Sequence, residues 1–393
     1  MKPRHILWVN EAARFTGGCE QYIYNTVKCL KQQGYRATLM YDGVAPEVDP
    51  KFTQLFDQAF PMVDIPRQVA AIAPDLIYIH RLKGTRLMEQ LCSAGVPAMR
   101  FYHDYVLFCM REHKYKTLSS DTCRQPIGFN CYTCLGFVNR SDQWPGVRLR
   151  RLGPMQAEIR ANYGLTAFVV GSQYMAGHLA DHGFDSTRTH VLPLYAFPPK
   201  AVEVQPRDTK LILYAGQMIR GKGVDTLLHA LHQCRHQDAR LVLVGSGRQL
   251  DTFKNIATEL GLNDRVTFEG QIPHEELARY YSRAAFLVVP SRYPETFGLI
   301  GPEAMSYGTP VIATDVGGIG EWMDHEEVGL SVPSNDPAPL AEAIDRLLDD
   351  PESALRMGAA GKAAYEAKFR PERHDEAMKA LIEQVIAAGP PHG

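Results

Sequence analysis

Two glutamates in the C-terminal half have a spacing that suits the binding of a hydroxylated and phosphorylated ligand. Glu295 and Glu303 are separated by seven residues, and Pro302 suits the first position of a helix. That helix start would place Glu303 in the opening turn. A carboxylate only accepts hydrogen bonds, so Glu303 suits the diol of a ribose and Glu295 suits the hydroxyl groups of a sugar. The alternative is two surface glutamates on a strand–loop–helix connection.

The loop between these glutamates suits an anion. Backbone N–H groups at the start of a helix converge on one place, and the helix dipole adds positive potential there. We therefore expect a diphosphate beside Phe297, Gly298, Leu299 and Ile300. A second glycine turn follows at 315–319, where the backbone can approach a phosphate closely.

Lys222 supplies a positive charge in the same half. It stands just before a predicted helix near 223–236. A nucleoside diphosphate gains negative charge as it leaves, and a fixed cation beside it would lower the barrier. An ordinary solvated lysine is the alternative.

The elements that must position these residues alternate between short apolar runs and helical patterns. This alternation is typical of parallel sheets with crossover helices. We predict an α/β protein with two Rossmann-like domains, 1–195 and 206–370, facing each other across a cleft. A Pro-rich linker joins them, and we expect a last helix near 371–387 to pack back on the first domain. In such sheets ligands bind at the carboxyl ends of the strands.

The chain resembles a known enzyme family in the runs YAGQMIRGKGVDTLLHAL, LVLVGSGR and PSRYPETFGLIGPEAMSYGTPVIATDVGGIGE. These are similar to glycosyltransferase family 4, whose members are retaining enzymes with the two-domain GT-B fold. The resemblance implies a UDP-, GDP- or ADP-sugar donor and a glycan, lipid or small-molecule acceptor. The chain has no D-x-D motif, so no metal is expected to take part in catalysis. A catalytically silent sugar-nucleotide-binding protein of the same fold is the alternative.

The same resemblance assigns roles in the C-terminal half. Glu295 would contact the transferred sugar, Glu303 the ribose, and Lys222 the diphosphate. The nucleotide base would lie between two short loops that contain Gly245, Gly247, Gln271 and Ile272.

One position departs from the family pattern. The family usually carries an arginine two residues after the alanine of a strand end, where this chain has Gln217. Arg220, three residues further on, is the candidate replacement, although its reach would differ. The departure concerns the phosphate contacts and leaves the site in place.

The N-terminal half offers a glycine turn and a histidine. Gly17 and Gly18 follow the first predicted strand, so their backbone would approach the donor phosphates or the acceptor. An ordinary β–α loop is the alternative. His103 ends the strand predicted at 96–102, and the resemblance assigns it to holding the donor sugar, with Asp104 orienting it. The alternative is a core histidine.

Four cysteines crowd the segment that follows His103, and two of them have C-x2-C spacing. Four thiolates are enough for a closed structural zinc site, so we expect one zinc ion there. Free thiols are the alternative, and an iron–sulfur cluster is less favoured. The cysteines are Cys109, Cys123, Cys131 and Cys134.

Bulk composition excludes some classes of protein. The formal net charge of −2 gives no general attraction to nucleic acid. No run of 18 apolar residues and no signal peptide is present, so we expect a cytoplasmic protein. A basic face around a short helix suggests contact with anionic lipid on the inner face of the membrane, or with an acceptor phosphate; a solvated face is the alternative. Its residues are Arg148, Arg150, Arg151 and Arg160.

Overall fold

The computed structural model describes residues 3–43, 47–116, 121–140, 146–197, 206–323 and 327–390. The chain forms two compact units. Unit 1 contains 1–113, 124–192 and 374–393, and unit 2 contains 114–123 and 193–373. The main division thus falls three residues before the expected end of the first domain. Most of the expected linker, residues 198–205, lies outside the described residues.

Unit 1 is built on a seven-stranded parallel sheet in the order β3-β2-β1-β4-β5-β8-β9. The first strand is therefore flanked by the second and the fourth, as in doubly wound sheets. The strands are β1 (His5–Asn10), β2 (Arg36–Tyr41), β3 (Gln58–Pro61), β4 (Leu76–Ile79), β5 (Ala98–Phe101), β8 (Ala167–Val170) and β9 (Thr189–Val191).

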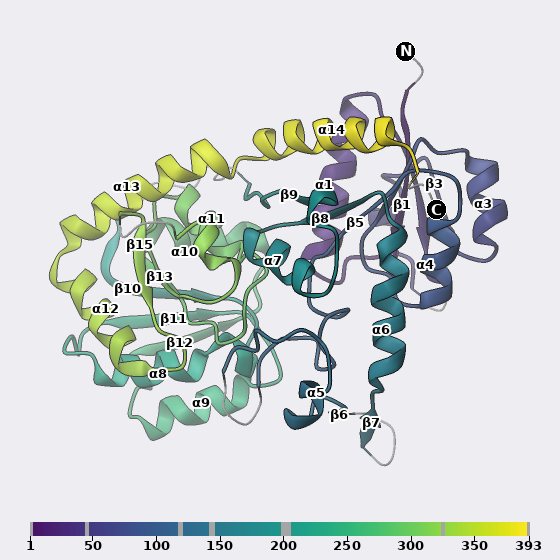
Figure 1. Cartoon of the computed structure of the whole chain (residues 1–393). Helices are drawn as coiled ribbons and strands as arrows, with labels where there is room; N and C mark the ends of the chain where they lie inside the picture. Colours follow the sequence, from purple (N-terminus) through teal and green to yellow (C-terminus); the bar gives the residue numbers. More distant parts are fainter. Residues whose placement is uncertain are drawn as a thin grey trace. The chain divides into compact units, whose positions relative to one another are not determined.

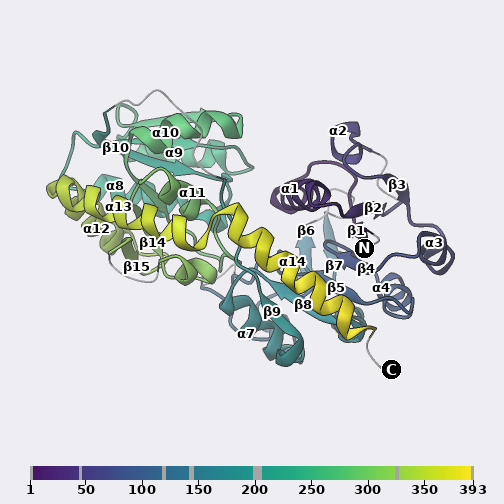
Figure 2. The ribbon, with the colours of Figure 1, turned by 90° about the horizontal axis from the view of Figure 1, so that it is seen from above.

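Helices cover both faces of this sheet because alternate side chains of each buried strand point to opposite sides. Leu7, Ile77 and Phe168 pack against α3, α4, α6 and α7. On the other face lies α1, and Figure 2 shows the strands between α1 and the pair α3 and α4. The helices are α1 (Gly18–Gln32), α2 (Pro50–Thr53), α3 (Ile65–Ile72), α4 (Thr85–Cys92), α5 (Asn130–Thr133), α6 (Leu152–Ala161), α7 (Gln173–Asp181), η1 (Asn162–Gly164) and η2 (Ser186–Arg188).

The last helix, α14 (Pro371–Ala388), belongs to unit 1 from His374 onward (Figure 1). It contacts α1, since Tyr22 Oη and His374 Nε2 share a hydrogen bond of 3.0 Å. Unit 1 also carries an antiparallel hairpin of β6 (Val138–Arg140) and β7 (Val147–Leu149), outside the main sheet.

Unit 2 is built on a six-stranded parallel sheet in the order β12-β11-β10-β13-β14-β15. Counted along the chain, this order is the 3-2-1-4-5-6 of the Rossmann fold. The strands are β10 (Asp208–Ala215), β11 (Arg240–Val244), β12 (Val266–Gly270), β13 (Ala284–Val289), β14 (Val311–Thr314) and β15 (Gly329–Val332).

Two apolar cores lie on the two faces of this sheet. Ile212 and Tyr214 of β10 belong to the core under α8, α9 and α12, and Leu213 and Ala215 belong to the core under α10, α11 and α13. The helices are α8 (Val224–Gln233), α9 (Leu250–Glu259), α10 (Leu277–Arg283), α11 (Ile300–Ser306), α12 (Pro337–Asp349), α13 (Pro351–Lys368), η3 (Arg220–Lys222), η4 (His274–Glu276) and η5 (Gly318–Glu321).

The predicted fold class, α/β with two Rossmann-like domains, is confirmed. One local prediction was wrong: α11 begins at Ile300, two residues before Pro302. Glu303 still lies in its first turn, as expected. Among the described residues, no helix combines the length and the apolar character needed to cross a membrane.

Candidate active site

The centre of the candidate site in unit 2 is an ion pair between Lys222 and Glu295. Lys222 ends η3, which follows β10, and Glu295 lies in the loop that follows β13. Because β10 and β13 are neighbours at the point where the strand order reverses, both loops leave the sheet at its usual ligand-binding edge. Lys222 Nζ lies 2.7 Å from Glu295 Oε1. Only 6% of the surface of Glu295 is exposed, and 21% of the Lys222 side chain is, so the pair is largely shielded from water.

Two hydroxyl groups fix the carboxylate of Glu295. Ser291 Oγ donates to Oε1 at 2.5 Å, and Tyr293 Oη donates to Oε2 at 3.1 Å. The Tyr293 ring also lies against the ammonium of Lys222, with Nζ 4.9 Å from the ring centre. Sequence reasoning missed both hydroxyls, although they stand only four and two residues before Glu295.

The electrostatics keep Lys222 charged. Burial alone would lower its pKa, but the adjacent Glu295 carboxylate, with Tyr293 and Tyr214, raises the pKa above its ordinary value. Burial and the charge of Glu295 raise the pKa of Tyr293 to about 12. At neutral pH the site therefore holds a positive ammonium beside a protonated phenol.

Glu303 is held by a tyrosine from a neighbouring helix. Tyr281 Oη, on α10, donates to Glu303 Oε2 at 3.0 Å. Burial and the Glu303 charge raise the pKa of Tyr281 well above its ordinary value, so its hydroxyl stays a donor. The preceding loop is anchored in the core, because Trp322 Nε1 donates to the carbonyl oxygen of Phe297 at 2.7 Å. Phe297 itself is fully buried.

The expected base-binding loops lie at the ends of β11 and β12. Ser246 Oγ donates to Gln271 Oε1 at 3.1 Å, and Ile272 packs against the apolar core. Packing within the protein already explains two glycines there. A Cβ on Gly245 would lie 1.9 Å from the carbonyl oxygen of Gly216, and one on Gly247 would lie 2.5 Å from that of Met218.

Arg220 begins η3 and stands two residues before Lys222. The carbonyl oxygen of Gln217 accepts a hydrogen bond from Tyr214 Oη at 2.8 Å, which ties the Gln217 backbone to the end of β10. The structure thus places both residues in the loop that carries Lys222.

A segment inserted into the sequence of unit 1 contributes to this part of unit 2. Residues 114–123 belong to unit 2, and Thr122 Oγ1 donates to the carbonyl oxygen of Arg292 at 3.1 Å. Arg292 lies between Ser291 and Tyr293, and its guanidinium pairs with Asp225 at 2.8 Å. No sequence pattern indicated that this segment would pack beside the loop of Glu295.

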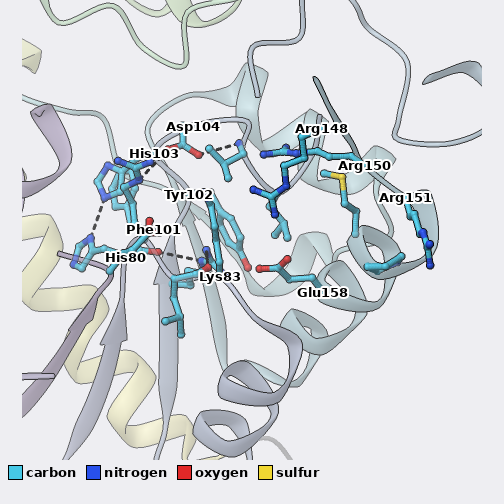
Figure 3. A pocket seen from close by; sticks show the side chains of 18 of the residues that line it. His80, Lys83, Phe101, Tyr102, His103, Asp104, Arg148, Arg150, Arg151 and Glu158 are labelled. Carbon is cyan, nitrogen blue, oxygen red and sulfur yellow. Dashed lines mark hydrogen bonds and ion pairs between the residues drawn. The ribbon is translucent and has the colours of Figure 1, made fainter. Parts of the chain in front are cut away.

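In unit 1, His103 pairs with a second histidine that the sequence did not single out. His80 follows β4 and His103 follows β5, and His80 Nδ1 lies 2.9 Å from His103 Nε2 (Figure 3). The two rings also stack at 5.2 Å. Burial, followed by the charges of Arg81 and Arg100, lowers the pKa of His103 to about 3. Burial, His103 and Arg100 lower the pKa of His80 well below its ordinary value.

Mild acid should therefore destabilise unit 1. Between about pH 6.5 and pH 3 the unfolded chain binds a proton at His103 that the folded chain does not bind. Stability is retained above this window and falls as the pH is lowered through it, by about 1.4 kcal/mol per pH unit for each such imidazole. Urea unfolding at pH 7, 6 and 5 should show a shallower pH dependence for His103→Gln than for the parent. The control His229→Gln removes an exposed histidine; equal slopes in all three proteins would contradict the expectation.

The glycine pair Gly17–Gly18 opens α1 as expected, with Gly17 at the N-cap. In the part of the chain that the structure describes, no atom beyond the neighbouring residues lies within 4 Å of a Cβ built on either glycine. Packing inside the protein therefore does not account for the two glycines.

The four cysteines of the expected zinc site do not form a ligand set in the described residues. Cys123 belongs to unit 2, whereas Cys109, Cys131 and Cys134 belong to unit 1. The described residues contain one group of three potential metal ligands within 4.8 Å of one another, namely Cys19, His80 and His103. Zinc binding by the four cysteines stays a prediction that metal analysis would test.

Comparison with known proteins adds the family. The family model described as "Glycosyl transferases group 1" matches residues 199–364, which hold the Lys222–Glu295 pair. The matched part, residues 199–364, is thus similar to the group 1 glycosyltransferases. The matched region contains Ser291, Tyr293 and Tyr281 as well as Lys222, Glu295 and Glu303.

Curated glycosyltransferases are similar to part of this chain. D-inositol 3-phosphate glycosyltransferase 1 of Catenulispora acidiphila is 42% identical over 172 residues, which are 40% of this chain and 41% of that protein. The chain thus aligns with less than half of this relative's length.

Solved structures match over the whole length. Sucrose-phosphate synthase from Thermosynechococcus elongatus has a TM-score of 0.71 at 25% identity and covers 98% of this chain and 100% of its own. Anabaena HepE, solved with UDP and glucose, has a TM-score of 0.70 at 17% identity and covers 97% and 100%. These GT-B glycosyltransferases share the fold of this chain.

Proposed function

We propose that this protein is a retaining, family 4 glycosyltransferase that moves a sugar from a nucleotide-diphosphate sugar to a hydroxyl group of an acceptor. The observation that carries the proposal is the shielded Lys222–Glu295 pair at the strand-order reversal of unit 2, inside the region that matches the family. The named relatives support a sugar nucleotide as donor, since HepE was solved with UDP and glucose.

Lys222 acts on the leaving group in this proposal. As the bond between the anomeric carbon and the diphosphate oxygen breaks, the diphosphate gains negative charge, and the ammonium stabilises that charge. The acceptor oxygen forms the new bond on the same face of the sugar. Its proton passes to an oxygen of the departing β-phosphate, so no protein nucleophile is needed and the anomeric configuration is kept.

Glu295 has two tasks. Its Oε1 holds Lys222 in place, and Ser291 and Tyr293 fix the carboxylate plane. A carboxylate fixed in this way accepts hydrogen bonds from sugar hydroxyls with little loss of conformational freedom. It therefore positions the donor sugar.

The other candidate residues bind the rest of the donor. Glu303 accepts hydrogen bonds from the ribose, and the loop 297–300 binds the diphosphate through its backbone. The ends of β11 and β12, with Ser246 and Gln271 in contact, border the base. Gly17 and Gly18 leave open space beside α1 for a phosphate or the acceptor.

His103 contributes a neutral imidazole. Because its pKa is lowered to about 3, it does not carry a proton at neutral pH and does not serve as an acid there. Its Nε2 lies 2.9 Å from His80 Nδ1. We assign the His103 imidazole to the donor sugar, as the resemblance to the family implies. We place no metal ion in the transfer step, because the chain lacks a D-x-D motif.

Product analysis tests the proposal. The full chain is incubated with UDP-, GDP- and ADP-sugars and a panel of acceptors, with and without a chelator. Nuclear magnetic resonance of the product should show the anomeric configuration of the donor, at equal rates in both conditions. An inverted product would remove the retaining mechanism, and donor binding without any transfer would support a silent sugar-nucleotide-binding protein instead.

A further inference from the structure

Unit 1 contains a cavity of about 350 Å³ at the carboxyl ends of β4 and β5 (Figure 3). One wall is formed by the residues that follow these strands, including His80, His103 and Asp104. The other wall is formed by β7 and the first turns of α6. A cavity of this size is in the range that holds small ligands.

Positive charge dominates the lining of this cavity. Six cationic side chains line it, against the three carboxylates of Glu11, Asp104 and Glu158. Figure 3 shows Arg148 and Arg150 extending toward the strand ends that carry Tyr102 and Asp104. The cationic residues are Arg81, Lys83, Arg100, Arg148, Arg150 and Arg151.

Few of these cations are neutralised by a carboxylate of their own. Arg150 and Lys83 share a single one, that of Glu112, with Lys83 at 4.0 Å. Arg81 lies 3.5 Å from Asp104. In the described part of the chain Arg148 and Arg151 have no ion-pair partner.

Of these six residues, Arg100 gives the strongest argument for a bound anion. It is 7% exposed, and its guanidinium donates to the carbonyl oxygens of His80 and Leu82 and to Asn162 Oδ1. All three acceptors are neutral, and among the described residues no carboxylate forms an ion pair with this buried guanidinium, which lines the cavity. Burying an uncompensated charge is costly, and a bound anion would offset that cost.

The histidine pair reports the same positive potential. Arg81 and Arg100 add to burial in lowering the pKa of His103. This potential opposes a metal cation, even though Cys19, His80 and His103 offer three ligand atoms near one another. It favours an anion at the same place.

We propose that this cavity binds the acceptor through a phosphate group, so that the substrate of transfer is a phosphate-bearing hydroxyl compound. The proposal rests on the proposed function and names its acceptor class. Arginine suits the role, because the planar guanidinium forms two parallel hydrogen bonds to phosphate oxygens. The phosphate belongs either to a small sugar or polyol phosphate or to a lipid headgroup. Val147 and Leu149 flank Arg148 and are 47% and 67% exposed. Because these apolar side chains could contact a membrane, the test also includes lipid vesicles.

The test uses a variant that removes two lining charges and a control that removes two others. Arg148→Gln with Lys83→Gln changes exposed side chains that line the cavity. Arg67→Gln with Arg86→Gln removes the same net charge from exposed positions of α3 and α4 outside the cavity. Circular dichroism checks that all proteins are folded.

Binding is measured by calorimetry at low ionic strength with glucose 6-phosphate and with glucose, and by sedimentation with phosphatidylcholine vesicles with or without phosphatidylglycerol. We expect a phosphate-bearing probe to bind the parent and the control pair, and the Arg148/Lys83 variant to bind it about tenfold more weakly or worse. Glucose 6-phosphate binding identifies a soluble acceptor, and vesicle binding identifies a lipid. Absence of both, or equal binding by the variant and the control pair, would overturn the proposal.

Titration of the same samples with UDP, GDP and ADP separates this proposal from the proposed function. If nucleotides bind and the phosphate-bearing probes do not, the proposed acceptor class is wrong and the proposed donor site is still supported. If the phosphate-bearing probes bind and no nucleotide does, the proposed donor site is wrong instead.

Discussion

Replacement of Lys222 by methionine should lower kcat by about 100- to 1000-fold, the loss expected when one group that stabilises transition-state charge is removed. Methionine keeps an unbranched chain of similar length and removes the ammonium that lies 2.7 Å from Glu295. The charge matters most when the diphosphate departs, so the KM for the donor should change less than kcat. Initial rates at saturating donor, before and after the substitution, give the answer.

Two further variants make this expectation specific. Lys254→Met removes an exposed lysine from α9 and should keep the parent's rate. In the double variant Lys222→Met, Glu295→Gln, the fold-decrease in kcat should be much smaller than the product of the fold-decreases in the two single variants. The reason is that the two side chains act as a unit. A near-normal kcat for Lys222→Met, or strictly multiplicative losses in the double variant, would count against the coupled role.

The sequence predicted Lys222 and Glu295 as separate site residues, but it did not predict the ion pair between them. The two residues are 73 positions apart, and each was assigned to a different part of the donor. Their contact depends on the strand order, in which β13 pairs with β10 although β11 and β12 intervene in the chain. Hydrophobic patterns predict where strands lie and leave their neighbours open. The Rossmann strand order of unit 2 is what brings these two loops together.

Other parts of the site were missed because nothing local marks them. Ser291 and Tyr293 look like ordinary loop residues until their hydroxyls are seen on Glu295. The strands β6 and β7 have three residues each, too short for an apolar alternation to show. The segment 114–123 packs with unit 2 although its neighbours in sequence belong to unit 1, a long-range choice that composition does not reveal.

The buried arginine of unit 1 shows a different limit. Arg100 stands within a predicted strand, VPAMRFY, that is otherwise mostly apolar, and nothing in the sequence indicated that an arginine there is buried. In the structure β5 lies between β4 and β8, so its side chain is buried and satisfied by carbonyl oxygens. The charge of the cavity therefore depends on burial, which one sequence does not provide.

Gly317→Ala should be the most destabilising of the single substitutions considered, with a loss of about 3 kcal/mol or more in unit 2. Gly317 has φ +65° and ψ −133°, a conformation that side chains with a Cβ rarely adopt. A Cβ at this position would lie 2.2 Å from the carbonyl oxygen of Glu295 and 2.6 Å from its nitrogen. Both atoms are backbone, so a change of rotamer cannot relieve the contact.

The position links stability to the site, because the same backbone holds Glu295. Glu295 and Gly317 form an isolated parallel bridge, and Gly318 N donates to the carbonyl oxygen of Glu295 at 2.7 Å. An added methyl group must push this loop away, which displaces the carboxylate that pairs with Lys222. We therefore expect Gly317→Ala to lose transfer activity even at temperatures where unit 2 remains folded.

Gly320→Ala is the matched control, since no atom of the described residues lies within 4 Å of a Cβ there and its φ is not in the left-handed region. Urea unfolding followed by tryptophan fluorescence compares the two variants, because Trp322 lies in the same loop and is 2% exposed. A midpoint for Gly317→Ala equal to that of Gly320→Ala would show that the loop has room for a Cβ. In that case the close approach of the Gly317 backbone to Glu295 would not be what fixes the carboxylate, and Ser291 and Tyr293 alone would have to hold it.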